Sequence, residues 1–277
     1  MTEDEGAVVC NDMNPFSFRL HVLRHAETVA NKAGIVLGQF DSPLTELGVK
    51  QAMAAHNEYG TNNYWKVFSS DLERCRKTSW LILFGTEIKD SDDAIQSGIH
   101  LDSRLRERSK GAREGQCKHL SYSEALALWE KRKESKGESC KDSVPFLESE
   151  EEVLERFQKW LEETICAAYT DYCSMKQCVC GEYNVLAISH SGTLRTVFEK
   201  MIGNQLPCDA EREDESGKSG RLVIPNTSKT IIEFTAVNES STTADEVRVV
   251  TLGEGSKPKF WRPRLLEYTN AAHFQKI

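Results

Sequence analysis

An arginine and a histidine follow the first apolar run of this chain, and a second histidine follows a later one. Residues 18–23 lead into Arg24 and His25, and residues 184–189 end at His190. In open α/β sheets, ligands bind at the carboxyl ends of the strands. A single Arg-His pair at a strand end is most often an ordinary surface pair, so the repetition carries the argument. The two histidines therefore predict one shared site at the edge of a sheet.

The segment after His190 favours an anion as the ligand. Residues 192–201 are expected to form a helix that Gly203 closes. The first turn of a helix offers unpaired backbone N–H groups and the positive end of the helix dipole to a negative group. A neutral histidine held through one ring nitrogen can attack phosphorus with the other, while nearby donors spread the charge of the phosphoryl group. These residue types therefore favour phosphoryl chemistry.

Two further segments could supply charged groups to this site. After the short apolar strand at residues 67–68, Ser70 and Glu73 have the spacing of a capping box, which places Arg74 in the first turn of a helix. Taken alone, Arg74 would fit a solvated helix residue better. Glu107 lies among arginines in a loop; such mixed charge is usually solvated surface, but this carboxyl group could also protonate a leaving oxygen.

The order of these motifs resembles the histidine phosphatase superfamily, in its phosphoglycerate-mutase-like branch. The resemblance covers about residues 19–237 and rests on LRHAET at 23–28, Asn31, DSPLTELG at 41–48, SSDLxR at 69–74, LxER at 105–108, ISH at 188–190 and PNT at 225–227. Within the family, residues 102–108 and 225–227 are most similar to fructose-2,6-bisphosphatase-like regulators of glycolysis.

The resemblance implies a role for each residue of the site. His25 would be the nucleophile that becomes phosphohistidine, and Glu107 would be the general acid and later the base that activates water. The other catalytic and phosphate-binding residues would be Arg24, Asn31, Gly38, Gln39, Arg74, His190 and Ser191. No metal or cofactor is needed, because two arginine forks and helix N–H groups supply fixed donors to phosphate oxygens.

Two positions depart from the family pattern. Ala26 replaces the usual glycine, which an alanine can do only if its φ stays negative. Leu147 precedes Glu148 where a Gly-Glu-Ser/Thr pattern is common, so the role of Glu148 is left open.

Glu107 must meet a further requirement if it is to act as an acid near neutral pH. Its pKa would have to be elevated by partial burial or by the charge of the substrate. The adjacent Arg106 and Arg108 would lower that pKa, so we expect both side chains to point away from the carboxyl group.

The sequence predicts a three-layer α/β/α sandwich with a mostly parallel central sheet of about six strands, as in phosphoglycerate mutase-like proteins. Strands are expected at residues 19–23, 66–68, 99–102, 184–189, 230–237 and 246–252. Helices are expected at residues 45–59, 122–132, 151–168 and 192–201, and the tail after Gly253 has no clear pattern. The helix at 151–168 carries an apolar stripe at helical spacing, expected to face the core: Val153, Phe157, Trp160, Leu161 and Thr164.

Length and composition are compatible with one catalytic domain. The chain has 277 residues, of which 39% are hydrophobic, so it can bury one large core. We expect residues 1–17 to be a mobile N-terminal tail and residues 18–277 to form a single domain. Within it, a cap segment is expected at about residues 109–147 and a mobile insertion at about residues 208–221.

Charge and cysteine content restrict the partners and the compartment. The net charge of −8 disfavours nucleic acid, whose phosphate backbone needs a basic face. No secretory signal or membrane-spanning segment is evident, and the nine cysteines are typical of reduced cytoplasmic thiols. Cys173, Cys178 and Cys180 lack paired Cys-x-x-Cys spacing and a fourth ligand, which favours free thiols over a metal site.

The resulting functional hypothesis is a phosphatase for a small phosphorylated metabolite, in particular a sugar phosphate. Fructose 2,6-bisphosphate is the first choice; sedoheptulose bisphosphate, 2,3-bisphosphoglycerate and a non-sugar phosphate remain alternatives. A mutase is disfavoured because mutases of this family carry a longer insertion than residues 109–147 provide. A phosphate-binding regulatory protein without activity is the remaining alternative.

Overall fold

The computed structural model describes residues 16–86, 98–135, 146–174, 182–207, 212–213, 221–237 and 260–270. Residues 1–15 of the predicted tail lie outside these ranges, whereas Ser17 already belongs to the first strand. Most of the predicted insertion at 208–221, the predicted strand at 246–252, Cys178 and Cys180 also lie outside the described residues.

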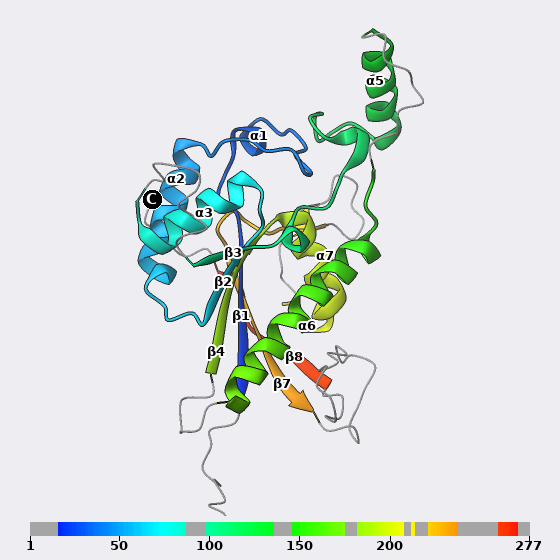
Figure 1. Ribbon diagram of the computed structural model, residues 1–277. Coiled ribbons are helices and arrows are strands. Elements are labelled where there is room, and N and C mark those ends of the chain that lie inside the picture. The colour runs from blue at the N-terminus through cyan, green and yellow to red at the C-terminus, as the bar shows by residue number, and fades with distance from the viewer. Residues whose placement is uncertain are drawn as a thin grey trace, which may run out of the picture.

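A six-stranded sheet forms the centre of the fold, with the order β3-β2-β4-β1-β7-β8 (Figure 1). The strands are β1 (Ser17–Arg24), β2 (Lys66–Ser69), β3 (Ile99–Leu101), β4 (Glu182–Ser189), β7 (Lys229–Val237) and β8 (Phe260–Asn270). The first four of these are mutually parallel, and β7 and β8 continue the sheet in antiparallel pairing. The predicted mostly parallel sheet is therefore confirmed. A short hairpin of β5 (Arg212–Glu213) and β6 (Arg221–Leu222) lies outside it.

Strand β8 is an element that the sequence did not reveal. Its exposed Arg262 and Arg264 flank Pro263, which is an unusual strand residue because it lacks an N–H donor. Pro263 lies opposite Phe234 at the edge of the sheet, where only one side of the strand needs ladder hydrogen bonds. The strand is anchored by the fully buried Trp261.

Helices cover both faces of this sheet (Figure 1). On one face lie α2 (Glu46–Ala55), which continues as a π-turn over His56–Gly60, and α3 (Glu73–Phe84). On the other face lie α6 (Glu150–Ser174) and α7 (Ser191–Met201). The shorter α1 (Val29–Lys32) follows β1. The predicted helices at 45–59, 151–168 and 192–201 correspond to α2, α6 and α7.

Alternation along the central strands separates the two cores. In β4, Val185 and Ala187 pack with α6 and α7, whereas Leu186 and Ile188 pack with α2 and α3. Successive residues of a strand point to opposite faces, so an uninterrupted apolar run serves both layers. The predicted stripe of α6 is buried at every one of its positions. This arrangement confirms the three-layer sandwich.

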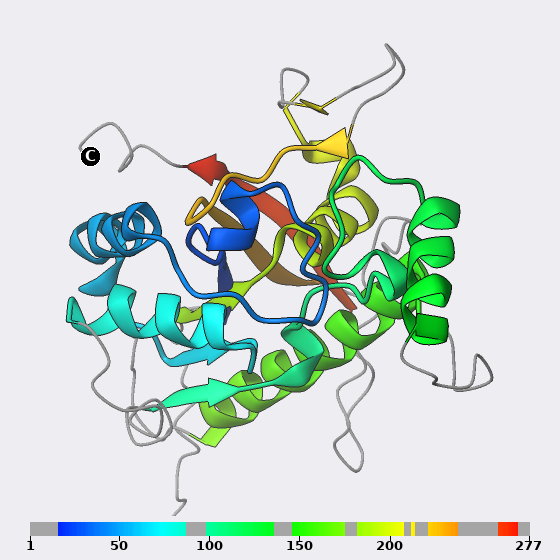
Figure 2. The same ribbon diagram turned by 90° about the horizontal axis from the view of Figure 1, so that it is seen from above.

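Strand register brings the ends of β1, β2 and β4 to one edge. Arg24 is opposite Ser189, and Ser69 is opposite Ile188. The residues that follow these strands therefore meet above the sheet, on the side that faces the viewer in Figure 2.

Helix α5 (Tyr122–Ser135) stands away from the body of the molecule (Figures 1 and 2). It belongs to the predicted cap segment and has one buried residue, Ala125. The predicted helix at 122–132 is confirmed, with a further turn at its end.

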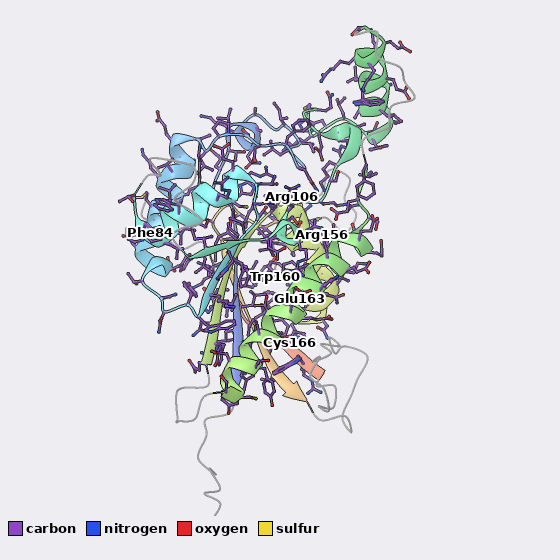
Figure 3. All side chains as sticks on the ribbon, in the orientation of Figure 1. Phe84, Arg106, Arg156, Trp160, Glu163 and Cys166 are labelled. Carbon is purple, nitrogen blue, oxygen red and sulfur yellow. The ribbon has the colours of Figure 1, made fainter. Side chains whose placement is uncertain are left out.

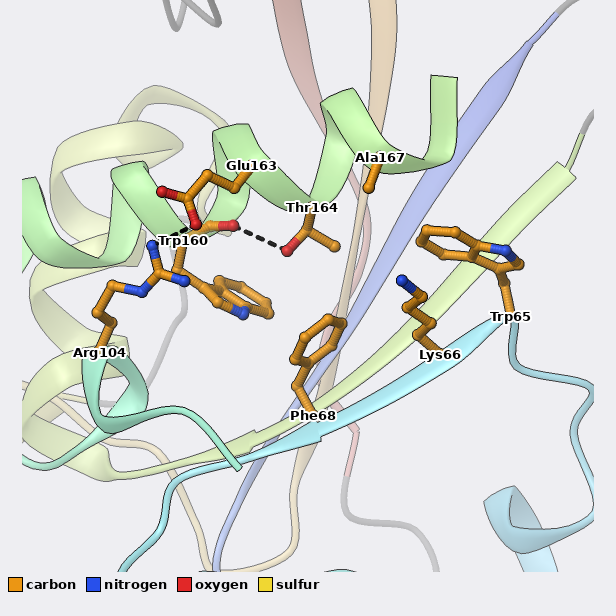
Figure 4. Close-up of a pocket in the computed structure, with 8 residues that line it drawn as sticks. All are labelled: Trp65, Lys66, Phe68, Arg104, Trp160, Glu163, Thr164 and Ala167. Carbon is orange, nitrogen blue, oxygen red and sulfur yellow. Dashed lines mark hydrogen bonds and ion pairs between the residues drawn. The ribbon is translucent and has the colours of Figure 1, made fainter. Parts of the chain in front are cut away.

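A groove between β2 and α6 lies apart from the predicted site (Figure 4). It encloses about 150 Å³ and contains none of the predicted site residues. Its lining consists of Trp65, Lys66, Phe68, Arg104, Trp160, Glu163, Thr164 and Ala167. Among the described residues, no helix is long and apolar enough to cross a membrane, and no three metal-ligating side chains form a cluster.

Candidate active site

His25 follows β1 and is only 3% exposed. Its Nδ1 lies 2.8 Å from the carbonyl oxygen of Ala26. A carbonyl can only accept, so Nδ1 carries the proton and the lone pair is on Nε2. Burial, followed by the nearby Arg74 and Arg24, holds the pKa of His25 well below its usual value. The ring is therefore neutral and has one nitrogen available for attack.

Ala26 keeps the backbone geometry that the sequence analysis required of it. The only non-glycine residue with positive φ in the described part of the chain is Thr227, so φ of Ala26 is not positive. The N–H of Ala26 donates to Thr78 Oγ1 at 3.0 Å, and its side chain is fully buried. Alanine thus fits where the family usually has glycine.

His190 follows β4 and lies beside His25, with 5.1 Å between the ring centroids. Arg74 Nε donates to its Nδ1 at 3.2 Å, so the proton of the neutral ring is on Nε2, 2.9 Å from Ser70 Oγ. Burial, Arg74 and His25 lower the pKa of His190 well below its usual value. The predicted meeting of the two histidines is thus present, with both rings neutral.

Arg74 is a buried component of this cluster rather than a solvated helix residue, since its side chain is 1% exposed. Besides His190, its guanidinium group binds Phe40 O at 2.5 Å, Asp41 Oδ1 at 2.9 Å and Gly38 O at 2.7 Å. An arginine has five N–H donors. Within the described part of the chain, one N–H of Nη2 is left without an acceptor.

The predicted capping box at Ser70 and Glu73 is wrong. Helix α3 has Leu72 as its N-cap, without a side-chain bond. Asp41 instead accepts from the backbone N–H of Glu73 at 2.8 Å and of Arg74 at 3.4 Å. The cap is thus supplied across space by a loop, which local spacing cannot reveal.

Arg24 lies at the end of β1, directly before His25. Its Nη1 donates to the carbonyl oxygen of Ile224 at 2.7 Å. Its charge contributes to the lowered pKa of the adjacent His25.

The other predicted phosphate ligands differ in how they connect to this cluster. Asn31 Oδ1 accepts at 3.3 Å from the N–H of Thr28, the N-cap of α1, while Gly38 offers its carbonyl group to Arg74. Gln39 Oε1 accepts from Arg106 Nη1 at 3.2 Å, and the half-buried Ser191 is the first residue of α7.

The carboxylate of Glu107 lies against the N-terminus of α7, and the residue is 7% exposed. Its carboxylate accepts from the backbone N–H groups of Gly192 and Thr193, both at 3.1 Å, and of Arg108 at 2.8 Å. The first-turn N–H groups that were expected to receive phosphate therefore bind this carboxylate.

The surroundings of Glu107 lower its pKa, in contrast to the elevation expected from burial. Burial alone would raise this pKa, but Lys110, the N–H groups of Gly192 and Arg108, and then Arg74 outweigh burial and lower it. The carboxylate is therefore ionised near neutral pH before a ligand enters.

Arg106 and Arg108 point away from Glu107, as expected. Arg106 forms a bidentate pair with Asp71, with N···O distances of 2.7 and 2.6 Å. Arg108 donates to Glu150 at 3.2 Å and to the carbonyl oxygen of Glu148 at 2.7 Å.

Glu148 and Arg156 support the loop that carries Glu107. The sequence analysis left the role of Glu148 open. Arg156 Nε lies 2.6 Å from Glu148 Oε1, and Arg156 Nη1 donates to the carbonyl oxygen of Arg104 at 2.5 Å. Figure 3 shows Arg106 and Arg156 beside α7, where the hydroxyl of Thr193 donates to Arg106 O at 2.7 Å. The sequence spacing of Glu148 and Arg156 does not predict this ion pair.

The two neutral histidines predict a pH dependence of stability. Unfolded histidines bind protons below a pKa of about 6.5, whereas folded His25 and His190 do so only at much lower pH. Their contribution is present above pH 6.5 and is lost as pH falls, by up to about 1.4 kcal/mol per pH unit per histidine. The slope of the unfolding free energy against pH, measured with urea between pH 7.5 and 5.5, should be smaller for His190→Asn than for the wild type. Exposed His100→Asn should keep the wild-type slope; equal slopes for His190→Asn and the wild type would contradict the assignment.

Comparison with known proteins gives the family. The model of the histidine phosphatase superfamily (branch 1) matches residues 20–239. Mouse fructose-2,6-bisphosphatase TIGAR is 39% identical over 129 residues, covering 46% of this chain but only 43% of the mouse protein. A broad-specificity phosphatase of Saccharomyces cerevisiae is 26% identical over 236 residues, covering 84% and 86% of the two chains.

The fold has solved counterparts. A phosphoglycerate mutase from Bacillus anthracis superposes with a TM-score of 0.50 at 20% identity, covering 95% of this chain and 97% of that one. That likeness concerns the fold alone. Because the family model matches most of the length of this chain, the chain belongs to the histidine phosphatase superfamily.

Proposed function

We propose that this protein hydrolyses a small phosphorylated metabolite through a phosphohistidine at His25. The observation that carries the proposal is the Nδ1–H bond to Ala26 O, which leaves the Nε2 lone pair of a neutral ring for phosphorus. Nε2 would form the bond to phosphorus while the bond from phosphorus to the leaving oxygen breaks. Water would then attack the phosphohistidine, releasing inorganic phosphate and the free ring.

Charge stabilisation would come from the groups around His25. Arg24 and the remaining N–H of Arg74 would donate to the phosphoryl oxygens, with His190 beside them. Further donors in this proposal are Asn31, Gly38, Gln39 and Ser191. These groups suffice without a metal, and the buried cations favour the charged phosphoryl group.

Glu107 would transfer the proton in both steps. Its lowered pKa fits this role if the incoming phosphate, a second negative group, raises that pKa on binding. The acid would protonate the leaving oxygen, and the resulting carboxylate would accept a proton from the attacking water.

For the substrate we propose fructose 2,6-bisphosphate. The support is the similarity to fructose-2,6-bisphosphatase TIGAR, which covers less than half of either chain. Hydrolysis is preferred over mutase chemistry because residues 109–147 leave room for only a short cap, whereas a mutase must keep water out between two transfers.

The covalent step is tested by trapping. Brief exposure to ³²P-labelled substrate, followed by an alkaline quench, should leave acid-labile, base-stable label on His25. His25→Ala should abolish label and turnover, whereas the exposed His100→Ala should retain both. Label on a serine or a cysteine would refute the proposed function.

The substrate assignment is tested by a panel of phosphorylated metabolites compared by kcat/KM, with released phosphate as the readout. Fructose 2,6-bisphosphate should give the highest value among sugar bisphosphates, phosphoglycerates and amino-acid phosphates. A higher value for another compound would replace the substrate. Isomerised product without released phosphate would identify a mutase.

The role of Glu107 is tested with leaving groups of different basicity. Glu107→Gln removes the transferable proton at constant size, so kcat for an alkyl phosphate should fall by roughly 10²- to 10⁴-fold. The single-turnover phosphorylation rate with an aryl phosphate should fall much less, because its leaving oxygen departs without protonation. Equal losses for both substrates would exclude Glu107 as the acid.

A further inference from the structure

The turn at residues 225–228 lies against the end of β1, far away in sequence. The N–H of Thr227 donates to the carbonyl oxygen of Arg24 at 3.0 Å, and the N–H of Arg24 donates to the carbonyl oxygen of Ser228 at 3.3 Å. The side-chain amide of Asn226 lies 2.8 Å from the carbonyl oxygen of His25. The turn therefore holds the backbone that carries the proposed nucleophile.

This turn is also strained. Thr227 has φ of +54° and is the only non-glycine residue with positive φ in the described part of the chain. A β-branched residue seldom adopts this conformation, and such residues persist where their surroundings hold them in place. Strained backbone of this kind clusters at functional sites.

The orientation of Asn226 follows from its partner. A carbonyl oxygen can only accept a hydrogen bond, so the Nδ2 amide group of Asn226, and not Oδ1, faces His25 O. On the other side of the same peptide unit, Thr78 Oγ1 accepts from the N–H of Ala26. One peptide plane, between His25 and Ala26, is thus fixed at both its C=O and its N–H.

This peptide plane is followed in the chain by the carbonyl group that determines the tautomer of the His25 imidazole. Ala26 O, the next carbonyl along the chain, accepts from His25 Nδ1. Rotation of the peptide between His25 and Ala26 would change both the direction of the side chain and the position of its acceptor.

We propose that Asn226 is a positioning residue, which orients His25 by clamping the peptide that follows it; the proposal rests on the proposed function. Asn226 does not touch the phosphoryl group. It holds His25 Nε2 in line for attack, where small displacements cost large factors in rate.

The test compares Asn226→Ala and Asn226→Ser with Ser228→Ala. Ser228 Oγ donates to Pro225 O at 2.7 Å inside the same turn, so its removal loosens the turn without removing a contact to His25. Single-turnover formation of phosphohistidine from an aryl phosphate should slow by about 10- to 100-fold in both Asn226 variants and by less than about twofold in Ser228→Ala. The Kd for inorganic phosphate should stay within about threefold of wild type in all three, because the arginines are intact.

A readout independent of turnover is the ¹⁵N NMR spectrum of His25, assigned by its loss in His25→Ala. The wild type and Ser228→Ala should show a single tautomer with Nδ1 protonated, and the Asn226 variants a mixture of both tautomers. The inference is overturned if the Asn226 variants keep the single tautomer, or if Ser228→Ala matches their loss in rate. A wild type that forms no phosphohistidine would refute the proposed function, while the tautomer comparison would still decide the role of Asn226.

Discussion

The site depends on one buried cation, whose N–H donors need hydrogen-bond acceptors. A guanidinium group removed from water is costly unless its donors are paired, and Arg74 pairs four of its five. Two of its acceptors, Gly38 O and Phe40 O, hold their loop against Arg74. Asp41, from the same loop, also caps α3. The fourth acceptor, Nδ1 of His190, fixes the tautomer of that ring. The same charge lowers the pKa of both histidines, so one interaction shapes the loop, the tautomer and the protonation state.

A second constraint concerns which anion binds the N-terminus of α7, a carboxylate of the protein or the phosphate. The free N–H groups of a helix end attract any nearby anion, and here they hold the carboxylate of Glu107. The Glu148–Arg156 pair supports that loop through Arg104 O and the N–H of Ser109. An incoming phosphate therefore meets an ionised carboxylate already in place, and the repulsion between them is what would convert this carboxylate into a proton donor.

The sequence predicted the parts of the site that follow from where its buried strands end. His25 and His190 come directly after two apolar runs, and parallel strands bring their ends to one edge. The parts that it did not predict depend on contacts across space. Asp41 caps a helix from another loop, and Glu107 takes the N–H groups expected to bind phosphate. Strand β8 was missed because Pro263 argues against a strand, whereas an edge strand tolerates it between the exposed Arg262 and Arg264.

The central claim is that a neutral His25 presents Nε2 to phosphorus between two arginines. A crystal structure of the wild-type protein with orthovanadate tests it most directly, because vanadate adopts the geometry of phosphoryl transfer. The account predicts vanadium bonded to His25 Nε2, with its equatorial oxygens hydrogen-bonded to Arg24 and to Nη2 of Arg74. Vanadium bonded to Ser70 or Cys75, or seated away from His25 with Nε2 turned aside, would contradict it.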